Sequence, residues 1–123
     1  MSQKLLIVDD NSLVRDLLRT CLAHDPYWEV CGEAENGREA VEKVEELKPD
    51  VVILDLQMPV MNGLEAARQI KALAPNTAMV MFTINCYPQL VAEARAAGIS
   101  DVISKTDLLA EGLLPALKTV RAA

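Results

Sequence analysis

VVILD, residues 51–55, is the most strand-like run of the chain and the stretch that decides the fold. Four consecutive apolar residues without polar alternation are typical of a strand that is covered on both faces in a parallel sheet. The run ends at Asp55, and a loop containing Pro59 and Gly63 follows. We therefore expect a parallel sheet whose polar side chains gather just beyond the ends of its strands.

Similar runs lie on both sides of this one and alternate with segments of helical spacing. Strands are expected at residues 5–8, 28–34, 78–82 and 102–103, and helices are expected between them, with a last helix beginning near Leu113. This alternation predicts an α/β fold: a doubly wound, five-stranded parallel sheet of flavodoxin-like order 2-1-3-4-5, with helices on both faces. No break in composition marks a linker, so residues 1–123 are expected to form a single domain.

The apolar positions also predict which face of each helix is buried. The first helix carries a wide stripe and is expected to end before Pro26, and the fourth, around residues 90–97, is expected to end at Gly98. The inward residues of the first three helices are expected to be, in chain order, Leu13, Val14, Leu17, Leu18, Cys21 and Leu22; then Ala40, Val41, Val44 and Leu47; then Leu64, Ala67, Ile70 and Leu73.

Composition excludes several classes of protein. Twelve Lys and Arg stand against 18 Asp and Glu, a formal net charge of -6, and no basic cluster offers a surface for nucleic acid. No apolar run approaches the roughly 18 residues that a membrane span needs. Cys21, Cys31 and Cys86 contain no CxxC pair, so we expect reduced thiols, mostly in the core, and a cytoplasmic location.

Polar residues follow the expected strands at the carboxyl edge of the sheet. Asp9 and Asp10 follow the first strand, Asp55 the third, Thr83 the fourth and Lys105 the fifth. In the order 2-1-3-4-5 the first and third strands are neighbours, so three carboxylates would share one pocket. Two like charges about 4 Å apart repel by roughly 4 kcal/mol at an effective dielectric constant of 20. Lys105 supplies one compensating charge, and a divalent cation would supply the rest.

Magnesium fits this donor set best, because it prefers carboxylate, carbonyl and water oxygens. Asp9, Asp10 and Asp55 are the expected ligands, together with the main-chain carbonyl of Gln57. A cation beside a carboxylate, a lysine and a hydroxyl suits phosphoryl transfer. We expect Asp55 to be the nucleophile, with Lys105 and the hydroxyl of Thr83 binding the phosphoryl oxygens.

The ordered set of these residues resembles the receiver domain of bacterial two-component response regulators. It comprises Asp9-Asp10, the pattern D-x-x-M-P-x-M-x-G over residues 55–63, Thr83 and Lys105, and it covers essentially the whole chain. The resemblance implies Mg²⁺-dependent transfer of a phosphoryl group to Asp55 from the phosphohistidine of a sensor histidine kinase or phosphotransfer protein. A population shift that changes a partner-binding face, and slow autodephosphorylation, would follow.

The resemblance also bears on partners. The local sequence looks like the subfamily whose receivers precede a helix-turn-helix domain, so a DNA-binding effector domain could lie beyond Ala123. The face that would respond to phosphorylation spans residues 87–120, and it could carry a homodimer interface. Direct contact of residues 1–123 with nucleic acid or with a membrane is not expected.

Three positions depart from the family pattern. Ile84 stands where a small residue usually leaves room for the phosphoryl group, and Val102 stands where a Tyr or Phe usually acts as a rotamer switch. Thr106 follows the lysine where a proline with a cis bond is usual. These changes leave the acidic residues intact but bear on the speed of phosphorylation and on how the signal is passed on.

The same residues fit other interpretations. Residues 9–12, Asp-Asp-Asn-Ser, could simply cap a helix, although capping by Asn11 or Ser12 is compatible with a metal site. A magnesium phosphatase would need an acid or base two residues after the nucleophile, where this chain has Gln57. We therefore expect a phosphoacceptor and not a turnover enzyme. A pseudo-receiver, which binds partners without being phosphorylated, is the main alternative.

Overall fold

The computed structural model describes residues 3–84, 87–105 and 117 of the chain. Five parallel strands form one sheet in the order β2-β1-β3-β4-β5. The strands are β1 (Gln3–Val8), β2 (Trp28–Ala34), β3 (Val51–Leu54), β4 (Ala78–Thr83) and β5 (Asp101–Ser104). The expected fold class and strand order are thereby confirmed, and β5 is longer than expected by one residue at each end.

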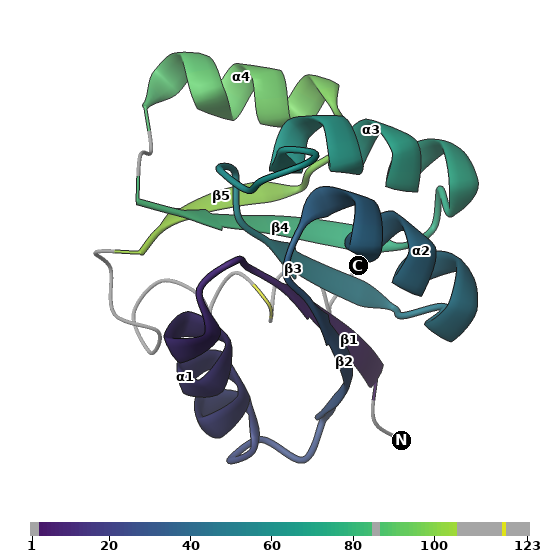
Figure 1. Cartoon of the computed structure of the whole chain (residues 1–123), viewed down its shortest axis with the longest axis vertical. Helices are drawn as coiled ribbons and strands as arrows, with labels where there is room; N and C mark the ends of the chain where they lie inside the picture. Colours follow the sequence, from purple (N-terminus) through teal and green to yellow (C-terminus); the bar gives the residue numbers. More distant parts are fainter. Residues whose placement is uncertain (1–2, 85–86, 106–116, 118–123) are drawn as a thin grey trace.

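Helices cover both faces of this sheet, with α1 on one side and α2, α3 and α4 on the other (Figure 1). Their bounds are α1 (Ser12–Leu22), α2 (Gly37–Leu47), α3 (Gly63–Leu73) and α4 (Pro88–Ala96). α4 begins two residues before the expected Leu90, because the fixed φ of Pro88 suits a first helical turn. The last helix, expected near Leu113, lies outside the described residues except for Leu117, which is helical and fully buried.

The central strands are buried on both faces, as their continuous apolar runs predict. In β1, Leu5 and Ile7 pack into the core on the α1 side, whereas Leu6 and Val8 pack into the core beneath α2, α3 and α4. Val8 of β1 pairs with Leu54 of β3. The residues that follow these two positions therefore emerge side by side at the carboxyl edge of the sheet.

Asparagine caps fix where three helices begin. The Asn11 side chain accepts a hydrogen bond from Leu13 N–H at 2.9 Å, so the capping role considered for residues 9–12 falls to Asn11. Asn36 and Asn62 cap α2 and α3 in the same way, each accepting from a glutamate N–H three residues later. Each cap satisfies amide groups that a helix start leaves without a partner, and so it fixes where the preceding loop ends.

Three of the predicted inward leucines are exposed. Leu13 and Leu17 of α1 are 76% and 57% exposed, and Leu73 at the end of α3 is 49% exposed. The stripe on α1 is too wide to pack entirely on a sheet, so only the row containing Leu18 and Leu22 is buried. Leu73 is the last residue of α3 and lines a cavity.

Other features of the described residues bear on class. Cys21 and Cys31 are free thiols, as expected, but each is only half-buried, and Cys86 lies outside the described part. Within residues 3–84 and 87–105, no helix is long and apolar enough to cross a membrane.

Candidate functional site

Three carboxylates meet at the carboxyl ends of β1 and β3. Asp9, Asp10 and Asp55 each place one oxygen within 4.8 Å of the others. Asp9 and Asp55 are 1% and 6% exposed, whereas Asp10 is open to solvent. Their proximity follows from the register of the sheet, because the N–H of Asp55 donates to the carbonyl of Val8 at 3.0 Å. The crowding of acids expected from the strand order is therefore present.

Lys105 lies between the two buried acids. Its Nζ is 2.7 Å from Asp9 Oδ2 and 3.4 Å from Asp55 Oδ2. Its backbone N–H donates to the carbonyl of Thr83 at 2.7 Å, which brings the end of β5 next to the end of β4. Burial opposes the charged form, but the hydrogen bond to Asp9 and the charges of Asp55 and Asp9 raise the pKa of Lys105 above its ordinary value. The ammonium group therefore stays protonated and holds the acids together.

Asp55 lies farther from the Lys105 ammonium group than Asp9 does. Burial and, after it, the charge of Asp9 raise the pKa of Asp55 from 3.8 to about 6, against the opposing effects of Lys105 and of the N–H of Leu56. Leu56 N–H donates to Asp55 Oδ1 at 2.8 Å. Both carboxylate oxygens of Asp9 have a close partner: Oδ1 accepts from Asn11 N–H at 2.9 Å, and Oδ2 pairs with Lys105 at 2.7 Å. The ammonium group of Lys105 thus contacts two carboxylates, and its contact with Asp55 is the longer one.

Two glycines allow the loop after Asp55 to pack closely. The N–H of Gly63 donates to the carbonyl of Leu56 at 2.8 Å, and a Cβ at Gly63 would lie 2.1 Å from the carbonyl oxygen of Asp55. Gly37 at the start of α2 donates to the carbonyl of Met61 at 3.0 Å, and a Cβ there would lie 2.3 Å from that oxygen. Neither position has room for a side chain. The loop is therefore held against both Asp55 and α2.

A cavity of about 360 Å³ opens above these groups. Its lining comprises Asp10, Asn11, Val14, Asp55, Gln57, Thr83, Ile84 and Lys105. The structure thus brings together the residues that the sequence singled out, with Asp9 buried beside them. Oxygen donors of this kind, including one exposed and two buried carboxylates, fit the preference of Mg²⁺ for hard ligands.

The positions that depart from the family pattern differ in their surroundings. Ile84 lines the cavity but is 62% exposed, so it stands at the rim and does not fill the pocket. Val102 is 8% exposed and packs in the core on the side of α2, α3 and α4. Thr106 and the peptide bond that precedes it lie outside the described residues.

Sequence reasoning did not anticipate one contact to this site. Arg15 of α1 donates from Nη1 to the backbone carbonyl of Asp9 at 2.6 Å and from Nε to Glu33 at 3.0 Å. The spacing of Arg15 and Asp9 along the chain gives no signal for this contact, because it depends on where β2 places Glu33.

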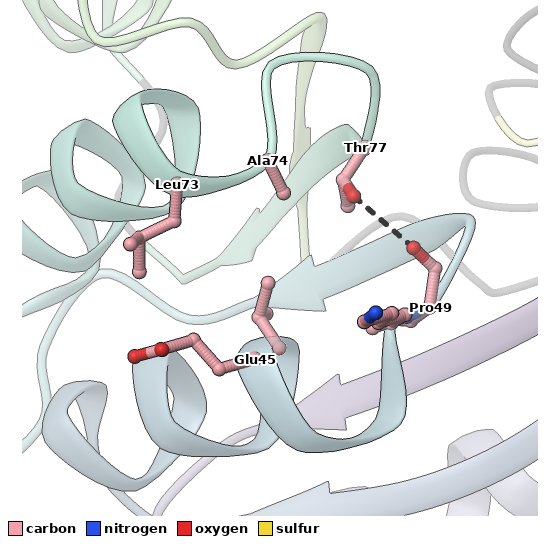
Figure 2. Close-up of a pocket in the computed structure, with 7 residues that line it drawn as sticks. Glu45, Pro49, Leu73, Ala74 and Thr77 are labelled. Carbon is pink, nitrogen blue, oxygen red and sulfur yellow. Dashed lines mark hydrogen bonds between the residues drawn. The ribbon is translucent and has the colours of Figure 1, made fainter.

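A second cavity of about 370 Å³ lies at the other end of the molecule, between the carboxyl-terminal turns of α2 and α3 (Figure 2). Its lining comprises Val44, Glu45, Lys48, Pro49, Leu73, Ala74 and Thr77. The Thr77 hydroxyl donates to the carbonyl of Pro49 at 3.1 Å and so closes one wall. The two cavities are similar in volume, so the chemistry of the lining, and not size, identifies the candidate site.

We predict that Asp55→Asn stabilises the chain in the absence of divalent cations. A pKa raised from 3.8 to about 6 means that the folded state binds the Asp55 proton more tightly than the unfolded state. This group therefore contributes stability at low pH, which is lost as the pH rises towards 6. Asparagine carries no charge to desolvate, so at pH 7 urea unfolding should show the variant to be more stable by about 1–3 kcal/mol.

The advantage of the variant should vanish near pH 4, where Asp55 is protonated in the folded wild type. A variant that is less stable than wild type at pH 7, or a difference that does not change between pH 4 and pH 7, would contradict this electrostatic description of the pocket.

Comparison with known proteins places the chain in a family. A family model described as the response regulator receiver domain matches residues 5–113. The chain is 44% identical over 105 residues to the chemotaxis protein CheY of Thermotoga maritima, a match that covers 85% of this chain and 87% of that protein. It is 36% identical over 129 residues to a protein-glutamate methylesterase/protein-glutamine glutaminase of Nocardioides, covering 95% of this chain but only 35% of that protein.

Solved structures agree with the sequence matches. A LuxR-family two-component response regulator from Aurantimonas superposes with a TM-score of 0.93 at 30% identity, covering 99% of this chain and 86% of that one. The response regulator domain of Thermotoga maritima CheB gives a TM-score of 0.89 at 33% identity, covering 100% and 96%. The family model, these relatives and the shared fold show that this chain belongs to the response regulator receiver domain family of two-component signalling.

Proposed function

We propose that this chain is a switch in which Asp55 accepts a phosphoryl group, in a Mg²⁺-dependent reaction, from the phosphohistidine of a sensor histidine kinase or phosphotransfer protein. Membership of the receiver family supports phosphorylation-controlled signalling as the general function. The observation that supports this particular chemistry is the pairing of Lys105 with Asp9 and Asp55 at the base of an open cavity. A nucleophile, a cation and a hydroxyl are thus available within one pocket.

In the proposed transfer, a carboxylate oxygen of Asp55 attacks phosphorus in line with the departing imidazole nitrogen. An O–P bond forms as the N–P bond breaks, and the electron pair of the broken bond stays on the imidazole. We assign Oδ2 as the attacking oxygen, because its contact with Lys105 Nζ is long, at 3.4 Å, whereas Oδ1 accepts a closer hydrogen bond from Leu56 N–H at 2.8 Å. Lys105 then pairs with one phosphoryl oxygen, and the Thr83 hydroxyl donates to another. The product is an acyl phosphate.

Asp9, Asp10, Asp55 and the main-chain carbonyl of Gln57 are the proposed magnesium ligands. Bound Mg²⁺ would neutralise charge on the carboxylates and on the phosphoryl oxygens. Lys105 Nζ lies 2.7 Å from Asp9 Oδ2. A cation that enters the site would therefore share the Asp9 carboxylate with Lys105. Asp10 is exposed and carries the charge by which an arriving cation would first be attracted.

We further propose that residues 1–123 act as a single phosphoacceptor domain that is not a turnover enzyme. The aspartyl phosphate would be lost by slow autodephosphorylation, in which water attacks the phosphorus, the P–O bond to Asp55 breaks, and inorganic phosphate and the Asp55 carboxylate are released. Gln57 supports this view, because its amide cannot serve as the acid or base that an aspartyl-phosphate phosphatase requires. The cytoplasmic location expected from the sequence stays a prediction.

Incubation of the chain with acetyl phosphate and Mg²⁺ tests the proposal directly. We expect the intact mass to increase by one phosphoryl group on wild type, and by none after Asp55→Asn or after removal of divalent cations with EDTA. Asp50→Asn is the matched control, because Asp50 is an exposed aspartate at the opposite edge of the sheet and should not affect labelling.

A wild type that gains no mass under these conditions would contradict the proposal and favour the pseudo-receiver alternative. Val102 favours this alternative, because a short, buried valine cannot act as the aromatic switch of the family. Partner binding that is identical for wild type and Asp55→Asn, with and without phosphodonor, would also support the pseudo-receiver alternative.

The exposed leucines of α1 supply a docking surface for the proposed phosphodonor protein. Leu13 and Leu17 lie one turn apart on α1 and are largely exposed. Asn11 and Val14 of the same segment line the cavity that contains Asp55. A partner that covers the two leucines would therefore place its phosphohistidine near the acceptor. Burying such side chains at an interface contributes through the removal of apolar surface from water.

We predict that Leu13→Ser with Leu17→Ser slows transfer from a phosphohistidine-bearing protein donor by about tenfold or more, which corresponds to about 1.4 kcal/mol of lost association. Labelling by phosphoramidate, a small N–P donor with no docking surface, should be unchanged. Leu73→Ser is the control, because Leu73 is similarly exposed but lies by the other cavity. Equal loss with both donors would show that the leucines do not form a docking surface.

A further inference from the structure

Both main-chain polar groups of Asp9, the N–H and the carbonyl, are hydrogen-bonded. Its N–H donates to the carbonyl of Ala34 in β2 at 3.0 Å, and its carbonyl accepts from Arg15 Nη1 at 2.6 Å. Arg15 is in turn fixed by Glu33, whose Oε1 accepts from Arg15 Nε at 3.0 Å. The side chain of Arg15 is only 16% exposed. One guanidinium group thus joins α1, the end of β2 and the turn that carries Asp9 and Asp10.

We propose that Arg15 is a positioning residue for the acidic site, which holds the Asp9 main chain so that the carboxylates of Asp9 and Asp10 face Asp55. This inference rests on the proposed function, because it assigns Arg15 a role in cation binding at that site. Arg15 does not line the cavity, so it acts through Asp9 and not on the phosphoryl group.

Glu33 is arranged to keep Arg15 in place. Burial alone would raise the pKa of Glu33, but the hydrogen bonds and the charges of Arg19 and Arg15 together outweigh it and lower this pKa, so the carboxylate remains charged. Lys43 also donates to the backbone carbonyl of Glu33. The guanidinium of Arg15 can engage Glu33 through Nε and Asp9 through Nη1 at once because its donors form a rigid, planar fork. A lysine offers a single ammonium group and cannot reproduce both contacts in this geometry.

Arg19 provides a matched control within the same helix. It also donates to Glu33, from Nε at 2.8 Å, but it is 48% exposed and has no contact with Asp9 among the described residues. Loss of Arg19 removes a partner of Glu33 and one positive charge from α1. Loss of Arg15 removes the same two things and, in addition, the support of the Asp9 carbonyl.

Electrostatics and positioning predict opposite results for Arg15. A positive charge close to a cation site weakens cation binding, so removal of the charge alone should tighten Mg²⁺ binding. Removal of a group that orients a metal ligand instead weakens binding, by about tenfold or more in other metal sites. The sign of the change therefore separates the two effects.

The test is calorimetric titration of Mg²⁺ into the wild-type chain and into Arg15→Met, Arg15→Lys and Arg19→Met, well below the unfolding temperature of each. We expect Arg15→Met to weaken Mg²⁺ binding by about tenfold. Arg15→Lys should also weaken binding although it keeps the charge, and Arg19→Met should stay within about twofold of wild type. With acetyl phosphate, the Mg²⁺ concentration for half-maximal labelling should rise for Arg15→Met while the rate at saturating Mg²⁺ changes much less.

Hydrogen exchange in the metal-free protein gives a second readout that does not depend on magnesium. The amide of Asp9, which donates to Ala34, and that of Asn11, which donates to Asp9 Oδ1 at 2.9 Å, should exchange faster in Arg15→Met and not in Arg19→Met. Magnesium binding by Arg15→Met that equals or exceeds wild type, with unchanged exchange at Asp9, would overturn the inference. If wild type itself binds no Mg²⁺, the proposed function fails, while the exchange result still decides whether Arg15 positions Asp9.

Discussion

Repulsion between carboxylates at one edge of the sheet is the constraint on which the site depends. The pairing of Val8 with Leu54 forces Asp9 and Asp55 to emerge together, and Asp10 follows directly. Lys105 compensates part of this charge, but it lies closer to Asp9 than to Asp55. Burial and, after it, the charge of Asp9 raise the pKa of Asp55 in spite of Lys105. A pocket of this kind favours a cation, and a carboxylate with high basicity is also the better nucleophile for phosphorus.

Sequence patterns predicted the fold and the clustering of polar residues at one edge of the sheet, because both depend on strand order. Continuous apolar runs mark strands buried on both faces, and residues after such strands meet at one edge once the order is known. Asp9, Asp55 and Lys105 were found in this way. The exposure of Leu13 and Leu17 was predicted wrongly, since helical spacing alone does not tell which part of a wide stripe a sheet can cover.

Contacts that depend on exact register were beyond the sequence patterns. Arg15 reaches the carbonyl of Asp9 only because Glu33 stands at the end of β2, and β2 contains a register shift opposite Leu5 and Leu6. The close approaches at Gly37 and Gly63 likewise depend on how a loop packs against its neighbours. Val102 departs from the family pattern, because a valine cannot act as an aromatic switch, and its side chain is buried. The proposed response to phosphorylation would therefore use other contacts. One such contact is the hydrogen bond from Gly63 N–H to the carbonyl of Leu56, which ties the loop to the residue next to Asp55.

Magnesium titration of the wild-type chain, followed by the backbone amide resonances, tests most directly whether Asp9, Asp10 and Asp55 form one pocket that binds Mg²⁺. A shared Mg²⁺ pocket predicts shifts that saturate at millimolar Mg²⁺ and that cluster at residues 9–11, at residues 55–57 and at Lys105. Shifts that do not saturate, or that gather instead over the exposed glutamates of α2 such as Glu42 and Glu46, would contradict it.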